Sequence, residues 1–303
     1  MNDAFRAVIL GIVEGLTEFL PVSSTGHMIL VEPLLGIKEG DPFWSGTFDI
    51  FIQIGAILAV LLYFWRRLYG LVVPTGARRY YVGGGSKNTL FPAGKVIEYP
   101  SVKEGGTGAR WQDHILFKLF VAFLPAAVVG LLADDFIESH LKTPVVVAGA
   151  LIVGGIAILL IELFMRRPKY TDAAAIPLRV AFLIGVAQCL SMIPGTSRSA
   201  ATIMGALVLG LSAPAAAEFS FFLAIPTMFA AGGYSLLKHL DEIERQQFAV
   251  LGLGFSVAFV VALVVVAGFM RFIQTHRFTS FAIYRIILGF IVLAVIWRGM
   301  GGA

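Results

Sequence analysis

Six apolar runs, each close to the length that crosses a bilayer, dominate this sequence. They cover residues of about 47–64, 115–133, 145–164, 215–237, 248–270 and 280–297. A transmembrane helix needs about 20 predominantly apolar residues. Only 14% of the 303 residues are charged, against about 25% in soluble domains. We therefore expect an all-α polytopic membrane protein, with residues 1–303 forming a single integral membrane domain.

The charges in the links between these runs alternate in sign. The links after the first, third and fifth runs are mainly basic. The other two links carry the acidic residues Asp134, Asp135, Glu138, Asp241, Glu242 and Glu244. Because basic links stay in the cytoplasm, we expect both chain termini on the outer face. The high pI of about 9.2 then reflects membrane topology, and we expect no nucleic-acid partner.

Four charged residues lie inside or beside the apolar runs. Lys118 and Arg285 are a few residues from the inner ends of their runs, so we expect both to snorkel to the interface. Asp49 and Glu218 are further candidates for the site, although structural or interfacial roles are favoured for both.

Two other apolar stretches, 4–36 and 179–211, are each broken near the middle by proline and polar residues. A broken helix frees backbone polar groups, which a membrane protein tolerates only where protein or a wet cavity satisfies them. Helical hairpins that enter and leave on one side of the membrane meet this need. The sequence therefore predicts six transmembrane helices plus two re-entrant helical hairpins.

The two breaks resemble each other. GIVEGLTEFLPVSST (11–25) aligns with GVAQCLSMIPGTSR (185–198) if one gap is allowed, which pairs Ser24 with Ser197. Each hairpin is followed by three runs, so the second unit enters the membrane in the opposite orientation. We expect an inverted-topology repeat of about 1–165 and 176–300, with 74–113 as a cytoplasmic loop insertion. The functional site of such a repeat lies where the broken segments meet.

The first break carries two carboxylates. Glu14 and Glu18 are four residues apart, on one face of a helix. Two buried carboxylates repel each other unless one is protonated or a cation lies between them. A hard divalent cation would stabilise them and could also bind phosphate oxygens. The alternative is a surface helix with solvated carboxylates, which the apolar neighbours disfavour.

Hydroxyl groups and a histidine follow in PVSSTGH (21–27). Ser23 and Thr25 can cap the next helix, and Gly26 allows close approach of the backbone. Free N–H groups at that helix start would bind an anion. Ser24 lies between the caps, and His27 could act as a general acid or base.

PGTSRS (194–199) repeats the arrangement with Thr196, Ser197 and Ser199, and adds Arg198. A guanidinium in an apolar segment needs an anionic partner, and its fork suits phosphate. The alternative partner is Glu14 or Glu18, in a salt bridge between the two breaks. Two phosphate-binding helix starts with acids and a histidine indicate phosphate ester or anhydride chemistry on a membrane lipid.

At these residues the chain resembles the undecaprenyl-pyrophosphate phosphatase family of the bacitracin-resistance type. EGLTEFLPVSSTGHM (14–28) and PGTSRSAAT (194–202) are similar to its two signature segments. The resemblance implies hydrolysis of undecaprenyl diphosphate to the monophosphate and phosphate, with a divalent cation, Mg²⁺ or Ca²⁺. It also implies a bacterial inner-membrane location and a site that faces the periplasm. The family's functional residues fall on Glu14, Glu18, Ser24, His27 and Arg198.

Several alternatives stay open. Inverted repeats with broken helices are also a transporter design, so a polyprenyl-phosphate flippase is the rival function. Within the enzyme, Ser24 is either the covalent nucleophile, which we favour, or part of a site that activates water. The expected partners are a polyprenyl diphosphate substrate and membrane lipids. A homodimer is one arrangement that the sequence allows.

Overall fold

The computed structural model describes residues 2–38, 40–72, 114–141, 143–165, 167–239 and 247–300. The expected loop insertion at 74–113 and the acidic residues Asp241, Glu242 and Glu244 lie outside the described residues. The described helices are α1 (Asp3–Thr17), α2 (Ser24–Leu34), α3 (Asp49–Val72), α4 (Ile115–His140), α5 (Pro144–Phe164), α6 (Leu178–Gln188), α7 (Arg198–Val208), α8 (Ala213–His239), α9 (Phe248–Phe272) and α10 (Thr279–Met300). Short helical turns are η1 (Phe43–Phe48), η3 (Ala173–Ala175) and η4 (Cys189–Met192).

Six helical segments among the described residues are long and apolar enough to cross a membrane. They are Phe43–Leu71, Ile115–Ala133, Pro144–Phe164, Ala213–Gly233, Phe248–Phe272 and Thr279–Arg298. These segments match the six expected runs, and the chain is a multi-pass membrane protein. The two broken stretches are also confirmed as broken, because each forms two short helices separated by an irregular segment.

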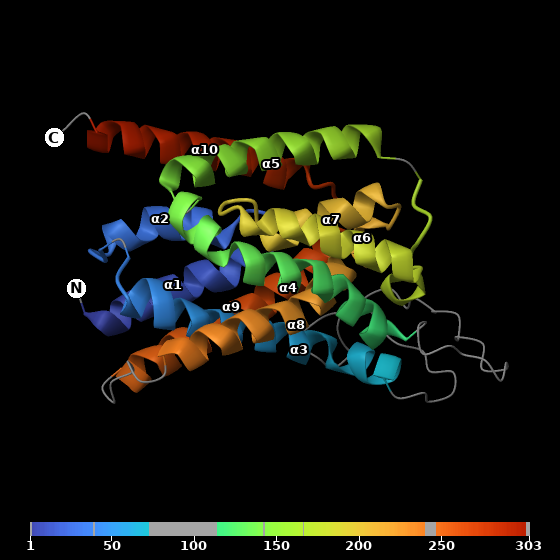
Figure 1. Cartoon of the computed structure of the whole chain (residues 1–303), viewed down its shortest axis with the longest axis horizontal. Coiled ribbons are helices and arrows are strands. Elements are labelled where there is room, and N and C mark those ends of the chain that lie inside the picture. Colours follow the sequence, from blue (N-terminus) through green and yellow to red (C-terminus); the bar gives the residue numbers. More distant parts are fainter. Residues whose placement is uncertain are drawn as a thin grey trace.

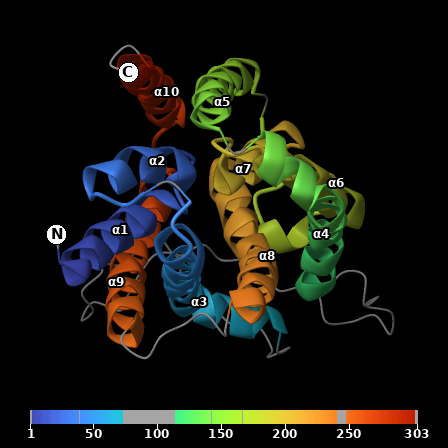
Figure 2. The same cartoon turned by 60° about the vertical axis from the view of Figure 1, so that its left-hand side comes forward.

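The long helices form two groups (Figures 1 and 2). The central pair α3 and α8 is flanked by α9 and α4, and the short helices α1 and α6 pack on α9 and α4 respectively. The second group is the pair of α5 and α10, which lies over α2 and α7. Consequently, both irregular segments lie between the two groups, enclosed by helices on several sides.

Glycines allow the short helices to approach the long ones closely. A Cβ on Gly15 in α1 would lie 2.8 Å from the carbonyl oxygen of Ala258 in α9. A Cβ on Gly185 in α6 would meet the carbonyl oxygen of Ala122 in α4. Apolar helices in lipid associate through such close packing, since lipid tails supply no hydrophobic drive between helices. These glycines therefore fix the position of each broken segment relative to the long helix beside it.

A network of ion pairs ties α3 to α8. Arg67 Nε lies 2.8 Å from Glu218 Oε1, and Arg67 Nη2 lies 2.6 Å from Asp172 Oδ1. Glu218 thus takes part in a structural network, as the sequence favoured. Lys118 differs from expectation, because its ammonium is buried and donates to the carbonyl oxygen of Ala174 at 2.8 Å.

The expectation that Arg285 snorkels to the interface is wrong. Its side chain is fully buried and donates hydrogen bonds to backbone carbonyl groups of α5 and of both breaks. The sequence of the apolar run shows only that Arg285 is a few residues from the end of the run. It shows neither how deeply the side chain is buried nor which carbonyl groups turn toward it. Those carbonyl groups come from segments far away in the sequence.

Glycine packing gives a stability test with a matched control on α9. In Gly254→Ala the new Cβ would clash with the Phe48 ring, whereas in Gly252→Ala nothing lies within 4 Å of it. We expect Gly254→Ala to destabilise the protein by about 1–3 kcal/mol through overpacking. Gly252→Ala should keep the wild-type melting temperature in detergent. Equal melting temperatures for the two variants would contradict this packing.

Candidate active site

Each break ends in a serine that caps the following helix. Ser23 precedes α2 with φ 73°, and Ser197 precedes α7 with φ 72°. Their side-chain oxygens accept from the N–H of Gly26 at 3.4 Å and of Ala200 at 3.3 Å. A positive φ costs an ordinary residue about 1–2 kcal/mol, and such strain tends to cluster at functional sites. Both breaks therefore enter their following helix through the same backbone conformation.

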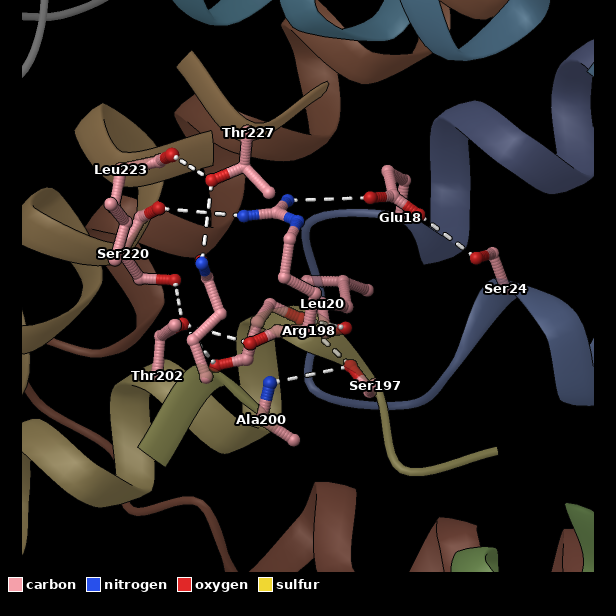
Figure 3. Close-up of polar contacts among 12 residues, drawn as sticks. Glu18, Leu20, Ser24, Ser197, Arg198, Ala200, Thr202, Ser220, Leu223 and Thr227 are labelled. Carbon is pink, nitrogen blue, oxygen red and sulfur yellow. Dashed lines mark hydrogen bonds and ion pairs between the residues drawn. The ribbon is translucent and has the colours of Figure 1, made fainter. Parts of the chain in front are cut away.

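Glu18 connects the two breaks (Figure 3). Its Oε2 accepts a hydrogen bond from Ser24 Oγ at 2.9 Å, within the first break. Its Oε1 lies 3.3 Å from Nη2 of Arg198, which belongs to the second break. Only 12% of the Glu18 side chain and 11% of the Arg198 side chain are exposed. The structure therefore brings together three of the expected site residues in one hydrogen-bonded row.

Arg198 has donors beyond those used by Glu18. Its Nη1 donates a long 3.5 Å bond to the carbonyl oxygen of Ser220, and its guanidinium lies 5.9 Å from the centre of the Phe19 ring. Its Nε is buried and has no hydrogen-bond partner. A buried guanidinium donor without a partner is costly. An anion with several oxygens could satisfy the donors that protein groups leave unmet.

Hydroxyl groups of the second break anchor it to the first. Ser199 Oγ donates to the carbonyl oxygen of Leu20 at 2.8 Å and also shares a 2.9 Å bond with Ser197 Oγ. Thr202, one turn into α7, bonds to the hydroxyl of Ser220. Ser199 and Thr202 are thus buried tethers, whereas Ser24 is the hydroxyl that touches the acid.

Glu14 lies one helical turn before Glu18 and is 2% exposed. The N–H of Glu18 bonds to the carbonyl oxygen of Glu14, so the expected shared helical face is confirmed. Glu14 Oε1 is buried without a hydrogen-bond partner, and the charges of Glu18, Asp49 and Arg198 lie within electrostatic range. Among the described residues, no three carboxylate, histidine or cysteine groups are placed to hold a metal ion together.

The hydrogen-bond partners of His27 lie outside this row. Its Nδ1 lies 2.7 Å from the carbonyl oxygen of Ser23, and its Nε2 lies 2.6 Å from the hydroxyl of Tyr284 in α10. The two rings also stack, with centroids 5.6 Å apart. Since a carbonyl oxygen can only accept, Nδ1 carries the proton, and Nε2 accepts from Tyr284 in the neutral ring. Both ring nitrogens are engaged, so His27 supports α2 in this arrangement.

The remaining expected residues differ in their surroundings. Thr25 is exposed and Thr196 is half-buried. Gly26 is buried, and a Cβ there would lie 2.9 Å from the Leu151 side chain, so its small size serves the packing of α2 on α5.

Sequence reasoning missed four neighbours of the site: Phe19, Ser220, Tyr284 and Arg285. Phe19 lies inside the first signature segment, but its residue type suggests no polar role there, and no local motif marks Tyr284 or the hydroxyl of Ser220. Arg285 carried a signal, since a charged residue inside an apolar run is usually functional.

The geometry suits chemistry on a phosphate group. A hydroxyl, a carboxylate that accepts its hydrogen bond, and an arginine follow one another along one row, beside two helix starts. Oxygen nucleophiles are activated by an adjacent base, and guanidinium groups stabilise developing charge on phosphoryl oxygens.

Comparisons with known proteins agree with this chemistry. The family described as bacitracin resistance protein BacA matches residues 7–291. An undecaprenyl-diphosphatase of Rhodopseudomonas palustris strain BisB18 is 43% identical over 303 residues, covering 99% of both chains. An undecaprenyl-diphosphatase of Fusobacterium nucleatum is 44% identical over 295 residues, covering 96% of this chain and 99% of the relative. The undecaprenyl-diphosphatase 3 of Acinetobacter baylyi is 42% identical over 293 residues, with 97% and 98% coverage.

Proposed function

The chain belongs to the BacA family of bacitracin resistance proteins, and from this premise we infer that it is an undecaprenyl-diphosphatase. It hydrolyses undecaprenyl diphosphate to undecaprenyl phosphate and inorganic phosphate. The reaction recycles the lipid carrier for peptidoglycan and other envelope polymers. One observation in the structure carries this function: Glu18 joins the hydroxyl of Ser24 to the guanidinium of Arg198, across two breaks far apart in the sequence.

In the mechanism that we propose, Ser24 Oγ attacks the terminal phosphorus of the diphosphate. Glu18 Oε2 takes the proton of the hydroxyl, because it already accepts the hydrogen bond. The bond from the terminal phosphorus to the bridging oxygen breaks, and undecaprenyl phosphate leaves with that oxygen. Water then hydrolyses the phosphoserine and releases phosphate. Trapping of phosphoryl-Ser24 after rapid quenching would distinguish this path from direct attack by water.

The ion pair of Glu18 and Arg198 represents the resting site. A phosphate group offers several oxygens and more charge than one carboxylate, so it can replace Glu18 Oε1 on the guanidinium. The exchange would free Glu18 to act as a base toward Ser24. Arg198 would then stabilise the charge that develops on the phosphoryl oxygens.

A divalent cation, Mg²⁺ or Ca²⁺, fits the residues present. Glu14 and Glu18 supply two carboxyl groups beside one guanidinium, so the site has an acidic group beyond the one that pairs with Arg198. The unpartnered Glu14 Oε1 is a free hard ligand. Mg²⁺ is commonly held by one or two carboxylates together with substrate phosphates, so this pair would suffice without a third protein ligand. When bound, the cation would supply charge neutralisation at the diphosphate.

The cation proposal predicts a metal requirement that depends on Glu14. Chelation with EDTA should stop phosphate release, and added Mg²⁺ or Ca²⁺ should restore it. In Glu14→Gln the half-saturating metal concentration should rise at least about tenfold. Asp3→Asn, an exposed site on the same helix, is the control and should titrate as the wild type. Undiminished activity in EDTA would overturn the proposal.

We also propose that the two breaks are re-entrant hairpins of an inverted repeat. Figure 1 draws α1 and α2 toward one end of the molecule, and α6 and α7 toward the other. Three pairs of matching features are separated by the same number of residues. They are the capping serines Ser23 and Ser197, the residues Leu35 and Leu209 that end the helices, and the positive-φ residues Gly36 and Gly210.

The helix contacts support the same repeat. In the repeat, α1 corresponds to α6 and α4 corresponds to α9. The contact of α1 with α9 therefore corresponds to the contact of α6 with α4, and both are present. The cap geometry changes one detail of the alignment, because it pairs Ser197 with Ser23 and needs no gap. Ser24 and Arg198 then occupy equivalent positions, each the first residue of its helix. The repeat thus supports one site built from two different residues at matching places.

We place the protein in the bacterial inner membrane, with the site open to the periplasm and the lipid substrate entering from the bilayer. The start of α1 and the end of α10 lie toward one end of the molecule, and the basic link after α5 lies toward the other (Figure 1). In a Cys189→Ser background, an impermeant thiol reagent should label Leu34→Cys from outside. Arg167→Cys should react only after permeabilisation, and the reverse pattern would contradict this orientation.

A flippase without hydrolysis is not favoured. A site that only binds a headgroup needs donors for the phosphate, whereas here a serine hydroxyl donates to a carboxylate base beside those donors. The relatives are also named as diphosphatases.

The catalytic row predicts the results of a phosphate-release assay on purified protein. Arg198→Ala should lower turnover at least about 100-fold, because it removes the phosphoryl-stabilising charge, while the variant still inserts and folds. Glu18→Gln should also cost at least about 100-fold. Ser212→Ala, a hydroxyl just past α7, should remain close to wild type. No phosphate release by the wild type with Mg²⁺ or Ca²⁺ would contradict the enzyme function.

A further inference from the structure

Arg285 lies within α10, in a position that links three parts of the fold. Its guanidinium is 0% exposed. Nη1 donates to the carbonyl oxygen of Pro21 at 3.3 Å, and Nη2 donates to that of Gly195 at 3.1 Å. Nη2 and Nε also reach the carbonyl oxygens of Ala150 and Leu151 in α5, at 3.2 and 3.5 Å. One side chain therefore bonds to both breaks and to the helix between them.

A charge buried in this way is costly to maintain. Within the described part of the chain Arg285 forms no ion pair, so backbone dipoles alone compensate the guanidinium. Burial of an unpaired charge is unfavourable unless hydrogen bonds satisfy it. The fold also makes room for the guanidinium, because a Cβ on Gly154 would clash with Nη2. An apolar residue at position 285 would fill the same space at a lower cost in free energy, so the buried guanidinium and the glycine opposite it need another explanation.

The two carbonyl groups of the breaks lie beside the catalytic row. Pro21 stands between Glu18 and Ser24, and Gly195 stands three residues before Arg198. Gly195 has φ 92° and packs against the backbone of Val147, so its carbonyl position is tightly constrained. Fixing both carbonyls to one rigid planar group fixes the distance between the breaks. That distance determines whether Glu18 reaches Arg198.

We propose that Arg285 is a positioning residue that clamps the two breaks together, so that the hydroxyl, the carboxylate and the phosphate-binding arginine meet. It touches no reacting group in this arrangement and acts through Pro21 and Gly195. The fork geometry of the guanidinium is essential, since its separate nitrogens reach the two breaks from one plane. The activity part of this inference rests on the proposed function, whereas the geometric part does not.

Gly154→Ala tests the clamp without removing the charge, because the new methyl group would displace the guanidinium. Gly149→Ala is the matched control on the same helix, where a Cβ meets nothing within 4 Å. We expect Gly154→Ala to lower kcat at least about tenfold with little change in KM, since small misplacements of catalytic groups cost turnover. Gly149→Ala should keep wild-type values of both constants.

A distance measurement gives a readout that is independent of activity. Spin labels at Leu16→Cys and Leu190→Cys, in a Cys189→Ser background, sit on exposed residues of the two broken segments. Double electron–electron resonance should show a broader distance distribution in Gly154→Ala than in Gly149→Ala. If the wild type releases no phosphate, the proposed function fails, and this distance measurement still decides the clamp.

Arg285→Lys separates the clamp from the charge alone. Lysine keeps the positive charge but has a single side-chain nitrogen. We therefore expect Arg285→Lys to show lower turnover and a broader distance distribution than the wild type. Wild-type turnover in Arg285→Lys would overturn the proposal. Identical kinetics and distance distributions in Gly154→Ala and Gly149→Ala would overturn it as well, and this pair remains decisive if Arg285 variants fail to fold.

Discussion

The ion pair between Glu18 and Arg198 is the interaction on which the site depends. It joins two segments that are far apart in the sequence, inside a body built almost entirely from apolar helices. Both side chains are mostly removed from solvent, where removing one partner of a pair typically costs about 3–5 kcal/mol. Such a pair can be kept only where the surrounding helices hold both breaks in register. The close glycine contacts of α1 with α9 and of α6 with α4 supply that register.

The same constraint links the fold to the chemistry. A broken helix in an apolar protein exposes N–H groups, and the capping serines Ser23 and Ser197 satisfy one of them in each break. The other N–H groups at each helix start are suited to bind an anion, as is the unpartnered Nε of Arg198. A lipid diphosphate provides such an anion at membrane depth. On the proposed function, the polar groups that would destabilise an ordinary membrane helix form the substrate site.

Much of this arrangement could be predicted from the sequence, because it depends on local patterns. Apolar run lengths give the six long helices, and the prolines with polar neighbours give both breaks. The contact of Glu18 with Arg198 was one of two alternatives for the arginine. The sequence could not show that His27 pairs with Tyr284, or that Arg285 is buried between the breaks. Both depend on how α10 crosses the other helices, and no local pattern encodes that crossing.

The central claim is that two breaks form one phosphate site. An experimental structure with a bound, non-hydrolysable diphosphate lipid would test it most directly. The account predicts that the terminal phosphate lies between Ser24 Oγ and the Arg198 guanidinium, with Glu18 released from the arginine. A phosphate group bound to one break alone, with the pair of Glu18 and Arg198 intact, would contradict it.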